Sequence, residues 1–398
     1  MPRRSSAGNR RRAALHTVWP LALACAGLVA CQTRAPVARQ APAPAPGGKL
    51  LLIGGGLDDD NRPVYERLLG LAAAHGRAHI VIMTAASGDQ DQEITDKSEA
   101  LRSWDPAVSW EPVRRETNTA DTVAAIERAT ALFFTGGDQQ RITDRYRPGA
   151  QSTPEWQAMQ RLLQRGGVIA GASAGDAMMG TTMFYGGASA TALGIVAKSP
   201  PKDPEAVDTQ DDEENPALPG PHLGPGMGLL PFAMTDSHFF ERNRVGRLVA
   251  ALEATHQTLG IGVGEDASVE VDLATGDIRG VSMGESLLLD VSQLQRHGLT
   301  RTGLRARLIR QGETIRAADW LAMAHTPVPA APGATRQLRV VDAGQNRQLA
   351  SWRLFHQASV PGSGTIQLDN NHYSLTAHPA GGGDVAFEVG EIGATDLQ

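Results

Sequence analysis

Cysteine is almost absent from this sequence of 398 residues, and several common functional motifs are missing altogether. The two cysteines, Cys25 and Cys31, both lie near the amino terminus, so the rest of the chain has no residue for a disulfide, a thiol nucleophile or a thiolate metal site. The sequence has no His-Glu-x-x-His motif, no cluster of histidines with carboxylates, and no Gly-Lys-Ser/Thr of a phosphate-binding loop. We therefore expect neither a metal ion nor another cofactor.

The first 31 residues have the pattern of an export signal. Five arginines without acidic residues lie between positions 3 and 12, and an apolar run from Ala13 to Ala30 follows. The run ends in Leu28-Val29-Ala30-Cys31, which resembles the lipobox of bacterial lipoproteins and implies cleavage before Cys31 and lipidation of its thiol. Gln32 resembles the residue found there in lipoproteins sorted to the outer membrane. An ordinary signal peptide with a periplasmic or secreted product, or an uncleaved anchor, is the alternative.

Export would leave a strongly acidic chain. Loss of the five arginines reduces the 37 basic residues to 32 against 43 acidic ones, which gives a net charge of about −11. No basic face then remains to neutralise phosphates, and we expect no nucleic-acid partner. The only expected membrane contact is the lipid anchor on Cys31. Residues 32–48 are rich in alanine and proline, and they predict an extended tether.

Residues 49–325 alternate short apolar runs with helical patterns, which predicts an α/β domain. Strands are expected at 49–53, 79–83, 108–113, 132–135, 168–170, 232–236 and from 259 to the acids at 265 and 266, with helices near 61–75, 91–103, 119–129, 153–164 and 240–255. This order is typical of a three-layer sandwich in which helices cover both faces of a mostly parallel sheet, with ligands beyond the carboxyl ends of the strands.

The carboxyl-terminal region has a different pattern. After a proline-rich linker, residues 332–398 alternate apolar and polar side chains over 337–341, 351–355, 365–368 and 372–377, with a turn at Asn370-Asn371. We expect a small β module there.

Ser173 lies in the pattern of a nucleophile elbow. A short apolar strand leads into Gly171-Ala172-Ser173-Ala174-Gly175, and a helix is expected from Ala177. Glycines two residues before and after a serine allow the sharp strand-to-helix turn that exposes its hydroxyl. The helix that follows would favour negative charge at the site. The alternative is a turn of small residues with an incidental serine.

The segment Thr135-Gly136-Gly137-Asp138-Gln139 also ends a predicted strand. Its two glycines let backbone N–H groups approach a bound atom, and acyl transfer needs such donors for the oxyanion. We assign the N–H groups of Gly137 and Ala174 to this role, and Gln139 to the substrate. The alternative is a plain helix start capped by Asp138. The Gly54-Gly55-Gly56 turn reads as a tight turn near the site rather than a phosphate loop, because three aspartates follow it.

His238 follows the strand that ends at Asp236, at the start of the next predicted helix. This is the position of a general base for a nucleophile at a neighbouring strand end. Arg242 lies one turn further on, and Arg244 and Arg247 flank the apolar stripe of the helix. Arginines at such a place suit a substrate carboxylate, which they bind in a bidentate manner.

An acid is expected to orient the imidazole, and Glu265 is the candidate, with Asp266 as its rival. The chain order Ser173, His238, Glu265 differs from that of α/β hydrolases, in which the acid precedes the histidine. Surface acids at a strand end are the structural alternative.

Four segments together resemble cyanophycinase and its relatives, which are serine peptidases with a flavodoxin-like, class I glutamine-amidotransferase-like fold. The segments are 134–139, 171–175, 236–248 and 260–266, and they occur in the family order and spacing within a likeness that covers about residues 48–320. The resemblance implies Ser173 as nucleophile, His238 as base and Glu265 as the third member. It also implies substrate contacts from a further set of residues: Gln139, Asp236, Arg242 and Arg247.

The same resemblance implies an exported serine peptidase that cleaves aspartyl-linked peptides through an acyl-enzyme. The expected substrate is cyanophycin, an aspartate polymer with arginine on its side-chain carboxyls, and the product is β-aspartyl-arginine. Ser237 replaces the glutamine usual in the family, and the acidic segment 198–226 is longer than expected. An α- or isoaspartyl dipeptidase, or a catalytically silent envelope protein that binds a ligand, is therefore the alternative. The oligomeric state is open, a homodimer included.

Overall fold

The computed structural model describes residues 47–195, 220–282, 284–323, 336–339, 350–360, 366–370 and 373–390. The predicted export segment, its Cys31, nearly all of the tether and residues 198–219 of the acidic segment lie outside these ranges. Within the ranges, no helix combines the length and the apolar character that a membrane span requires.

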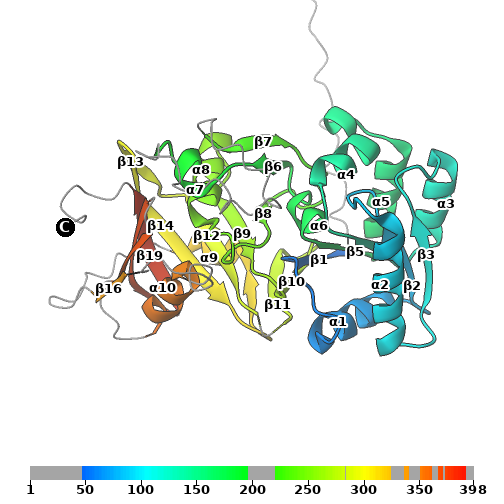
Figure 1. Cartoon of the computed structure of the whole chain (residues 1–398). Coiled ribbons are helices and arrows are strands. Elements are labelled where there is room, and N and C mark those ends of the chain that lie inside the picture. Colours follow the sequence, from blue (N-terminus) through cyan, green and yellow to red (C-terminus); the bar gives the residue numbers. More distant parts are fainter. Residues whose placement is uncertain are drawn as a thin grey trace, which may run out of the picture. The chain divides into compact units, whose positions relative to one another are not determined.

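Five parallel strands form the centre of the first sheet. They are β1 (Lys49–Ile53), β2 (His79–Met83), β3 (Ser109–Val113), β4 (Ala131–Phe134) and β5 (Val168–Ala172), in the spatial order β3-β2-β4-β5-β1. Beyond β1, the antiparallel strands β10 (Ser268–Asp272), β11 (Asp277–Gly280) and β15 (Thr314–Arg316) complete the sheet. The predicted α/β class with a mostly parallel sheet is confirmed (Figure 1).

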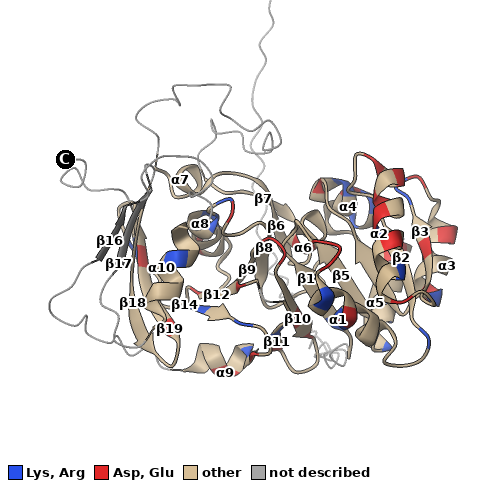
Figure 2. Cartoon of the chain, turned by 60° about the horizontal axis from the view of Figure 1, so that its bottom comes forward, with Lys and Arg blue, Asp and Glu red and all other residues tan. Residues whose placement is uncertain are grey.

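Helices cover both faces of this sheet. Those on one face are α1 (Arg62–Ala72) and α2 (Gln90–Trp104), and those on the other are α3 (Thr119–Arg128), α4 (Gln139–Tyr146) and α5 (Pro154–Gln164). Side chains alternate across a strand, so Leu51 and Ile53 of β1 pack with the core under α1 and α2, whereas Leu50 and Leu52 pack with the opposite core. Strand β1 is therefore buried against apolar side chains on both faces, which explains why it reads as a nearly unbroken apolar run. In Figure 2 several positions of α2 are coloured as acidic.

A second sheet contains the strands that lead to His238 and Glu265. Its order is β16 (Arg336–Arg339), β17 (Ile366–Asn370), β18 (Tyr373–Gly381), β19 (Asp384–Gly390), β14 (Thr300–Ile309), β12 (Ser286–Asp290), β9 (Leu259–Val263) and β8 (Met234–Asp236), with β13 (Gln295–His297) paired to β14. The sequence predicts one sheet for all the strands of the domain, and this prediction is wrong. An apolar run of five residues indicates a buried strand but does not identify its neighbours.

The second sheet has a core of its own. Helices α8 (Val245–Thr255) and α10 (Ala350–Ala358) pack on it, together with the short α7 (Ser189–Ala192). Helix α8 begins at Val245 rather than near residue 240, so residues 238–244 form a turn. Residues 351–355 belong to α10 and not to the predicted strand, because the buried Ser351, Leu354, Phe355 and Ala358 follow helical spacing.

The strands of the carboxyl-terminal region join this sheet. Strand β19 pairs antiparallel with β14, and β18 pairs with β19. The strands of residues 332–398 therefore extend a sheet that also contains β9 and β12, and the domain boundary at 332 stays a prediction.

Several short elements lie around the site. They are α6 (Ala174–Ala177), the antiparallel ribbon of β6 (Thr182–Gly186) and β7 (His222–Pro225), the turn at Pro148–Ala150 and α9 (Ala317–Ala322). The sequence predicts no regular element in 198–226, and β7 shows that this is wrong for its last residues. The helix after Ser173 is a single turn, so its dipole contributes less at Ser173 than the sequence suggests.

Candidate active site

Ser173 lies in a strained turn directly after β5. Its φ of 54° and ψ of −109° are unusual for a residue with a side chain. Glycines make this turn possible: a Cβ on Gly171 would lie 2.1 Å from the carbonyl oxygen of Gly175, and one on Gly175 would lie 2.6 Å from that of Phe134. The N–H of Ser173 donates to the carbonyl of Ile53 at 3.0 Å, which fixes the turn to β1. These features are those of a nucleophile elbow.

The three side chains predicted to act together lie in one hydrogen-bonded row. Ser173 Oγ lies 2.8 Å from His238 Nε2, and His238 Nδ1 lies 2.7 Å from Glu265 Oε1. A carboxylate can only accept, so Nδ1 carries the proton and Nε2 is left to accept from the serine hydroxyl. This is the arrangement that prepares a serine for attack on a carbonyl carbon.

The row joins the two sheets. Strands β1 and β5 are parallel, with Ile53 beside Ala172. Gly54 and Ser173, which follow these two strands, therefore lie at the same edge of the first sheet. In the second sheet β8 and β9 are parallel with Asp236 beside Gly262, and their ends place His238 and Glu265 together. Ser173 therefore comes from one sheet and the other two side chains from the other, whereas the sequence places all three at the rim of a single sheet.

The Gly54-Gly55-Gly56 turn connects these loops. The N–H of His238 donates to the carbonyl of Gly54 at 2.7 Å, and the N–H of Asp266 donates to that of Gly55 at 2.8 Å. A Cβ on Gly55 would lie 2.3 Å from Cε1 and 2.4 Å from Nε2 of His238, and the φ of Gly55 is +101°. Only glycine leaves room for the imidazole here. The sequence predicts a tight turn near the site but not this contact, because a run of glycines does not say what packs against it.

Glu265 and Asp266 have different surroundings. Asp266 Oδ1 accepts from Nδ2 of Asn61 at 2.7 Å and from the N–H of Asp58 at 3.1 Å, so this carboxylate holds the turn before α1. The N–H of Glu265 donates to Oε2 of Glu241 at 3.0 Å, and burial raises the pKa of Glu241. Of the two acids that the sequence leaves in competition, the structure brings Glu265 to the imidazole.

The imidazole is held in its neutral form. The pKa of His238 is lowered to about 4, first by burial and then by the positive charge of Arg242, while the hydrogen bond to Glu265 acts in the opposite direction. His238 has a φ of 45°, which is another strained position. A neutral imidazole at ordinary pH is what a general base requires.

The predicted oxyanion donors lie next to the nucleophile. Gly137 has a φ of +127°, and a Cβ there would lie 2.3 Å from the carbonyl oxygen of Ala86. A Cβ on the neighbouring Gly136 would lie 3.5 Å from Cβ of Ser173. Among the described residues, the N–H groups of Gly137 and Ala174 make no hydrogen bond. Both residues line the same cavity as Ser173.

Asp138 also has the capping role that the sequence gives as the structural alternative. Its Oδ1 accepts from the N–H of Gln140 at 2.8 Å at the start of α4. The cap does not exclude the role predicted for Gly137.

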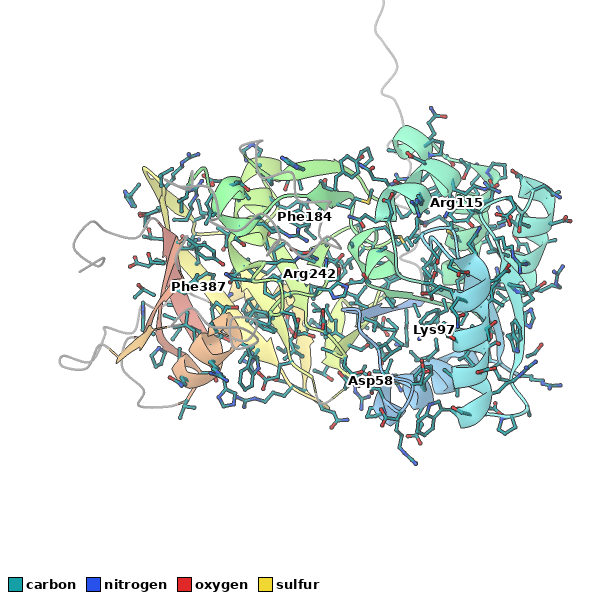
Figure 3. The ribbon with its side chains drawn as sticks, viewed as in Figure 1. Asp58, Lys97, Arg115, Phe184, Arg242 and Phe387 are labelled. Atoms are coloured by element: carbon teal, nitrogen blue, oxygen red, sulfur yellow. The ribbon has the colours of Figure 1, made fainter. Side chains whose placement is uncertain are left out.

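A cavity of about 500 Å³ lies beside Ser173 and is rich in arginine. Its lining comprises Gly137, Asp138, Gln139, Arg141, Ser173, Ala174, Ala177, Phe184, Gly186, Ser237, His238, Arg242, Arg244 and Arg247. Among the described residues of this lining, four guanidinium groups face a single carboxylate, an arrangement that favours a negatively charged ligand. In Figure 3 Arg242 and Phe184 lie in the middle of the view, between Phe387 of β19 and Arg115.

The four predicted substrate contacts lie at different depths. Gln139, Arg242 and Arg247 line the cavity, and Gln139 Nε2 donates to the carbonyl of Phe184 at 2.7 Å. Asp236 is absent from the described residues that line the cavity, and it is only 1% exposed. Its carboxylate instead accepts from Arg247 at 2.8 and 2.6 Å. The structure therefore places Asp236 behind Arg247, where it holds that arginine.

The sequence prediction gives no role to the cavity side chains of Phe184 and Arg141, and Ser237, where the sequence departs from the family, also lines the cavity. Phe184 lies 4.6 Å below the guanidinium of Arg247, measured to the ring centre, and Ser237 is buried beside the base. Arg141 lies one turn into α4, 3.5 Å from Asp138. Arg141 could have been predicted as a site residue, because it lies three residues after the Gly136-Gly137-Asp138 turn. No sequence pattern near Phe184 indicates that it lies at the site.

Residues 50–278 match the family model of Peptidase family S51. This match covers more than half of the chain, which therefore belongs to Peptidase family S51, a family of serine-type peptidases. Its relatives are of the cyanophycinase type. The cyanophycinase of Nostoc sp. strain PCC 7120 is 28% identical over 265 residues, which cover 62% of this chain and 74% of the relative. The cyanophycinase of Geminocystis herdmanii is 32% identical over 142 residues, or 35% and 42% of the two chains.

Among solved structures, a peptidase from an acI-B1 Actinobacterium is similar to 68% of this chain and 96% of its own, with 17% identity and a TM-score of 0.47. The predictions of a serine-type peptidase and of a cyanophycinase-like family are thus confirmed by the family match and the curated relatives.

Proposed function

We propose that this chain is an exported peptidase that hydrolyses aspartyl-linked peptides through an acyl-enzyme on Ser173. Cyanophycin is the proposed substrate and β-aspartyl-arginine the product. The observation that carries the proposal is the continuous row from Ser173 Oγ through His238 to Glu265, with contacts of 2.8 and 2.7 Å. The names of the curated relatives, which are cyanophycinases, support the choice of substrate.

In the first step His238 Nε2 takes the proton of Ser173 Oγ while that oxygen bonds to the scissile carbonyl carbon. The carbonyl oxygen becomes an oxyanion next to the N–H groups of Gly137 and Ala174. Glu265 stabilises the imidazolium that forms. The C–N bond then breaks as Nε2 returns its proton to the departing amine. Water, which gives a proton to the same nitrogen, attacks the acyl carbon. The bond between that carbon and Oγ then breaks, the carboxylic acid product leaves, and Nε2 returns the proton to Oγ.

The arginines of the cavity supply the proposed selectivity. A free carboxylate close to the scissile bond would pair with guanidinium groups of Arg242, Arg244 or Arg247, and such charge-assisted hydrogen bonds contribute about 1.5–3 kcal/mol each. Burial, and then the charges of Arg242 and Arg244, lower the pKa of His238, so two of the groups that attract the substrate also favour the base form of the imidazole.

An α- or isoaspartyl dipeptidase is the second candidate. Ser237, which replaces the usual glutamine of the family, is buried and lines the cavity. A shorter side chain there changes the room for the substrate without changing the row of Ser173, His238 and Glu265. The acidic substrate group is common to both candidates.

The test is incubation of the purified protein with cyanophycin and with α-aspartyl and isoaspartyl (β-aspartyl) dipeptides, followed by mass spectrometry of the products. We expect β-aspartyl-arginine from cyanophycin and no product with Ser173→Ala, whose melting temperature should match that of the wild type. Cleavage of dipeptides alone would favour the second candidate. A wild-type protein that cleaves nothing but melts higher with these compounds would instead be a binding protein, which would contradict the proposal.

We also propose that the protein is a lipoprotein of the cell envelope. The arginine-rich start, the apolar run and the Leu-Val-Ala-Cys ending at Cys31 support it. Labelled palmitate should enter the full chain in a bacterial host and should be lost in Cys31→Ala. Equal labelling of both would contradict lipidation at this residue, and release of both into the medium would favour the secreted alternative.

A further inference from the structure

The carboxyl-terminal region reaches the turn that carries the base and the arginines. Tyr373 of β18 is 1% exposed, and its hydroxyl oxygen lies 2.7 Å from Oδ1 and 3.1 Å from the backbone oxygen of Asn243. Asn243 stands between Arg242 and Arg244, which both line the cavity. Tyr373 lies outside residues 50–278, so nothing in the matched family region accounts for this contact.

Asn243 is a strained residue whose conformation decides the course of the turn. Its φ of 52° is left-handed, which asparagine tolerates better than most residues but still at a cost. The turn from His238 to Arg244 thus has a left-handed residue near each end. A change of φ at Asn243 would swing Arg244 and the start of α8 relative to Arg242.

The backbone oxygen of Asn243 is a junction of hydrogen bonds. Ser189 Oγ donates to it at 2.6 Å, and the N–H of Arg247 donates to the same Ser189 Oγ at 3.1 Å. The hydroxyl of Tyr373, in the carboxyl-terminal strand β18, contacts the same backbone oxygen. Asn243 is therefore linked to three arginines. Arg242 and Arg244 are its neighbours in the sequence, and Arg247 is connected to it through Ser189.

We propose that Tyr373 is a positioning residue of the peptidase, which holds Asn243 in its left-handed conformation and so sets Arg242 and Arg244 at the cavity. The inference rests on the proposed function, because it assigns these arginines to the substrate carboxylate. It gives the carboxyl-terminal region a role in substrate binding. Tyr373 itself touches neither Ser173, His238 nor Glu265 among its described contacts, so the chemical step should not depend on it.

The test is Tyr373→Phe, which removes one oxygen atom and keeps the ring. We expect KM for the cleaved aspartyl substrate to rise about fivefold, the size expected for one neutral hydrogen bond, while kcat changes by less than about twofold. The rate at which the neutral reagent phenylmethanesulfonyl fluoride labels Ser173 should stay unchanged, because that reaction needs the row but not the arginines.

Leu375→Val is the matched control. Leu375 lies two residues along the same strand, is fully buried in the same core, and carries no polar group toward Asn243. It should lower the melting temperature and leave KM unchanged. An equal rise of KM in Leu375→Val and Tyr373→Phe, or no rise in Tyr373→Phe, would overturn the inference. Asn243→Gly should raise KM as well, and the double variant with Tyr373→Phe should add little, since both remove one contact.

A second measurement separates this inference from the proposed function. If the wild type is labelled at Ser173 but cleaves no substrate offered, the proposed function fails, and protection of Ser173 by succinate then serves as the readout. The succinate concentration that halves the labelling rate should be about fivefold higher in Tyr373→Phe. Equal concentrations in the two proteins, or a wild type that succinate does not protect, would overturn the positioning role.

Discussion

The turn of Ser173 and the turn of His238 are both strained, but different forces hold them. Around Ser173 the constraint is steric: glycines at 171 and 175 let backbones approach to distances that any Cβ would prevent. Around His238 the constraint is polar: Asp236 pairs with Arg247, Glu241 accepts from the loop of Glu265, and Tyr373 contacts Asn243. The glycines that shape the Ser173 turn lie within two residues of the serine, whereas the polar contacts of the His238 turn also come from distant parts of the chain.

The difference has consequences for substitution. An added methyl group in the Ser173 turn has nowhere to go, because its neighbours are backbone atoms that cannot rotate away. In the His238 turn, each polar contact can be removed separately, so each substitution should remove only part of the support of the turn. Of the five predictions below, which begin with the largest expected effect, the first three test these two kinds of constraint and the last two test the environment of His238.

Glu265→Gln tests the polar contact closest to the chemistry. An amide keeps the shape but removes the charge that stabilises imidazolium, and it permits the wrong tautomer of His238, so kcat should fall by about 10³–10⁴-fold. Steady-state kinetics with the best aspartyl substrate measures this. The matched variant Asp266→Asn should keep kcat within about twofold, because its oxygen can still accept from Asn61. Equal losses in the two variants would mean that Glu265 has no special role.

Asp236→Asn tests the buried ion pair behind the cavity. It leaves Arg247, 3% exposed, without its carboxylate, and such a loss costs about 3–5 kcal/mol in the free energy of unfolding. Urea denaturation measures that loss, and KM should rise because Arg247 loses its support. Glu66→Gln breaks the exposed Arg62–Glu66 pair and should change stability by less than about 1 kcal/mol. A stable Asp236→Asn protein with unchanged KM would contradict the positioning role of this acid.

Gly55→Ala tests the steric contact where the two turns meet. The new Cβ would lie 2.4 Å from Nε2 of His238, so the imidazole must move away from Ser173 and kcat should fall by about 100-fold. Gly276→Ala controls for backbone strain, since Gly276 also has positive φ (+72°) but no atom within 4 Å of the added carbon. It should lose some stability and no activity. An active Gly55→Ala enzyme would show that the imidazole has more freedom than this packing implies.

The pH dependence tests the charge effect of Arg242. Because the pKa of His238 is lowered to about 4, kcat/KM should stay high as pH falls and decline only near pH 4, where the base becomes protonated. Arg242→Gln should raise that pKa and move the decline to higher pH, in addition to any effect on KM. A pH–rate profile of both proteins measures the shift, and identical profiles would exclude this charge effect.

The lowered pKa of His238 also makes the free energy of unfolding depend on pH. Unfolded histidine has a pKa of about 6.5, so between about pH 6.5 and 4 the unfolded chain binds a proton that native His238 does not. The protein should therefore lose stability as pH falls through this range, and thermal melts at several pH values should show a smaller loss in His238→Gln than in the wild type.

Sequence patterns were most successful where the structure depends on neighbours along the chain. Ser173 could be found because the elbow needs small residues at fixed spacing on both sides, and that spacing is visible in the sequence. The first sheet could be predicted because its strands are buried on both faces. His238 and Glu265 could be proposed as partners from their places after strands, although their meeting depends on a second sheet that was not foreseen.

The wrong prediction for residues 351–355 and the contacts that the sequence does not predict have the same physical cause. Residues 351–355 were predicted as a strand because five residues are too few to separate a period of two from a period of 3.6, and packing on the second sheet decides for a helix. The place of Asp236 behind Arg247, the contact of Gly55 with the imidazole and the contact of Tyr373 with Asn243 all join residues that no local pattern links.

The sequence by itself determined the parallel sheet with its two helical layers, the turn that exposes Ser173 and the order of the three side chains, because these follow from burial and backbone sterics over short stretches. Only the tertiary structure decided which acid faces the imidazole, which arginines surround the cavity and how strand β18 reaches Asn243 in the turn that follows His238. Those outcomes depend on contacts between distant segments, whose geometry is set when the two sheets pack together.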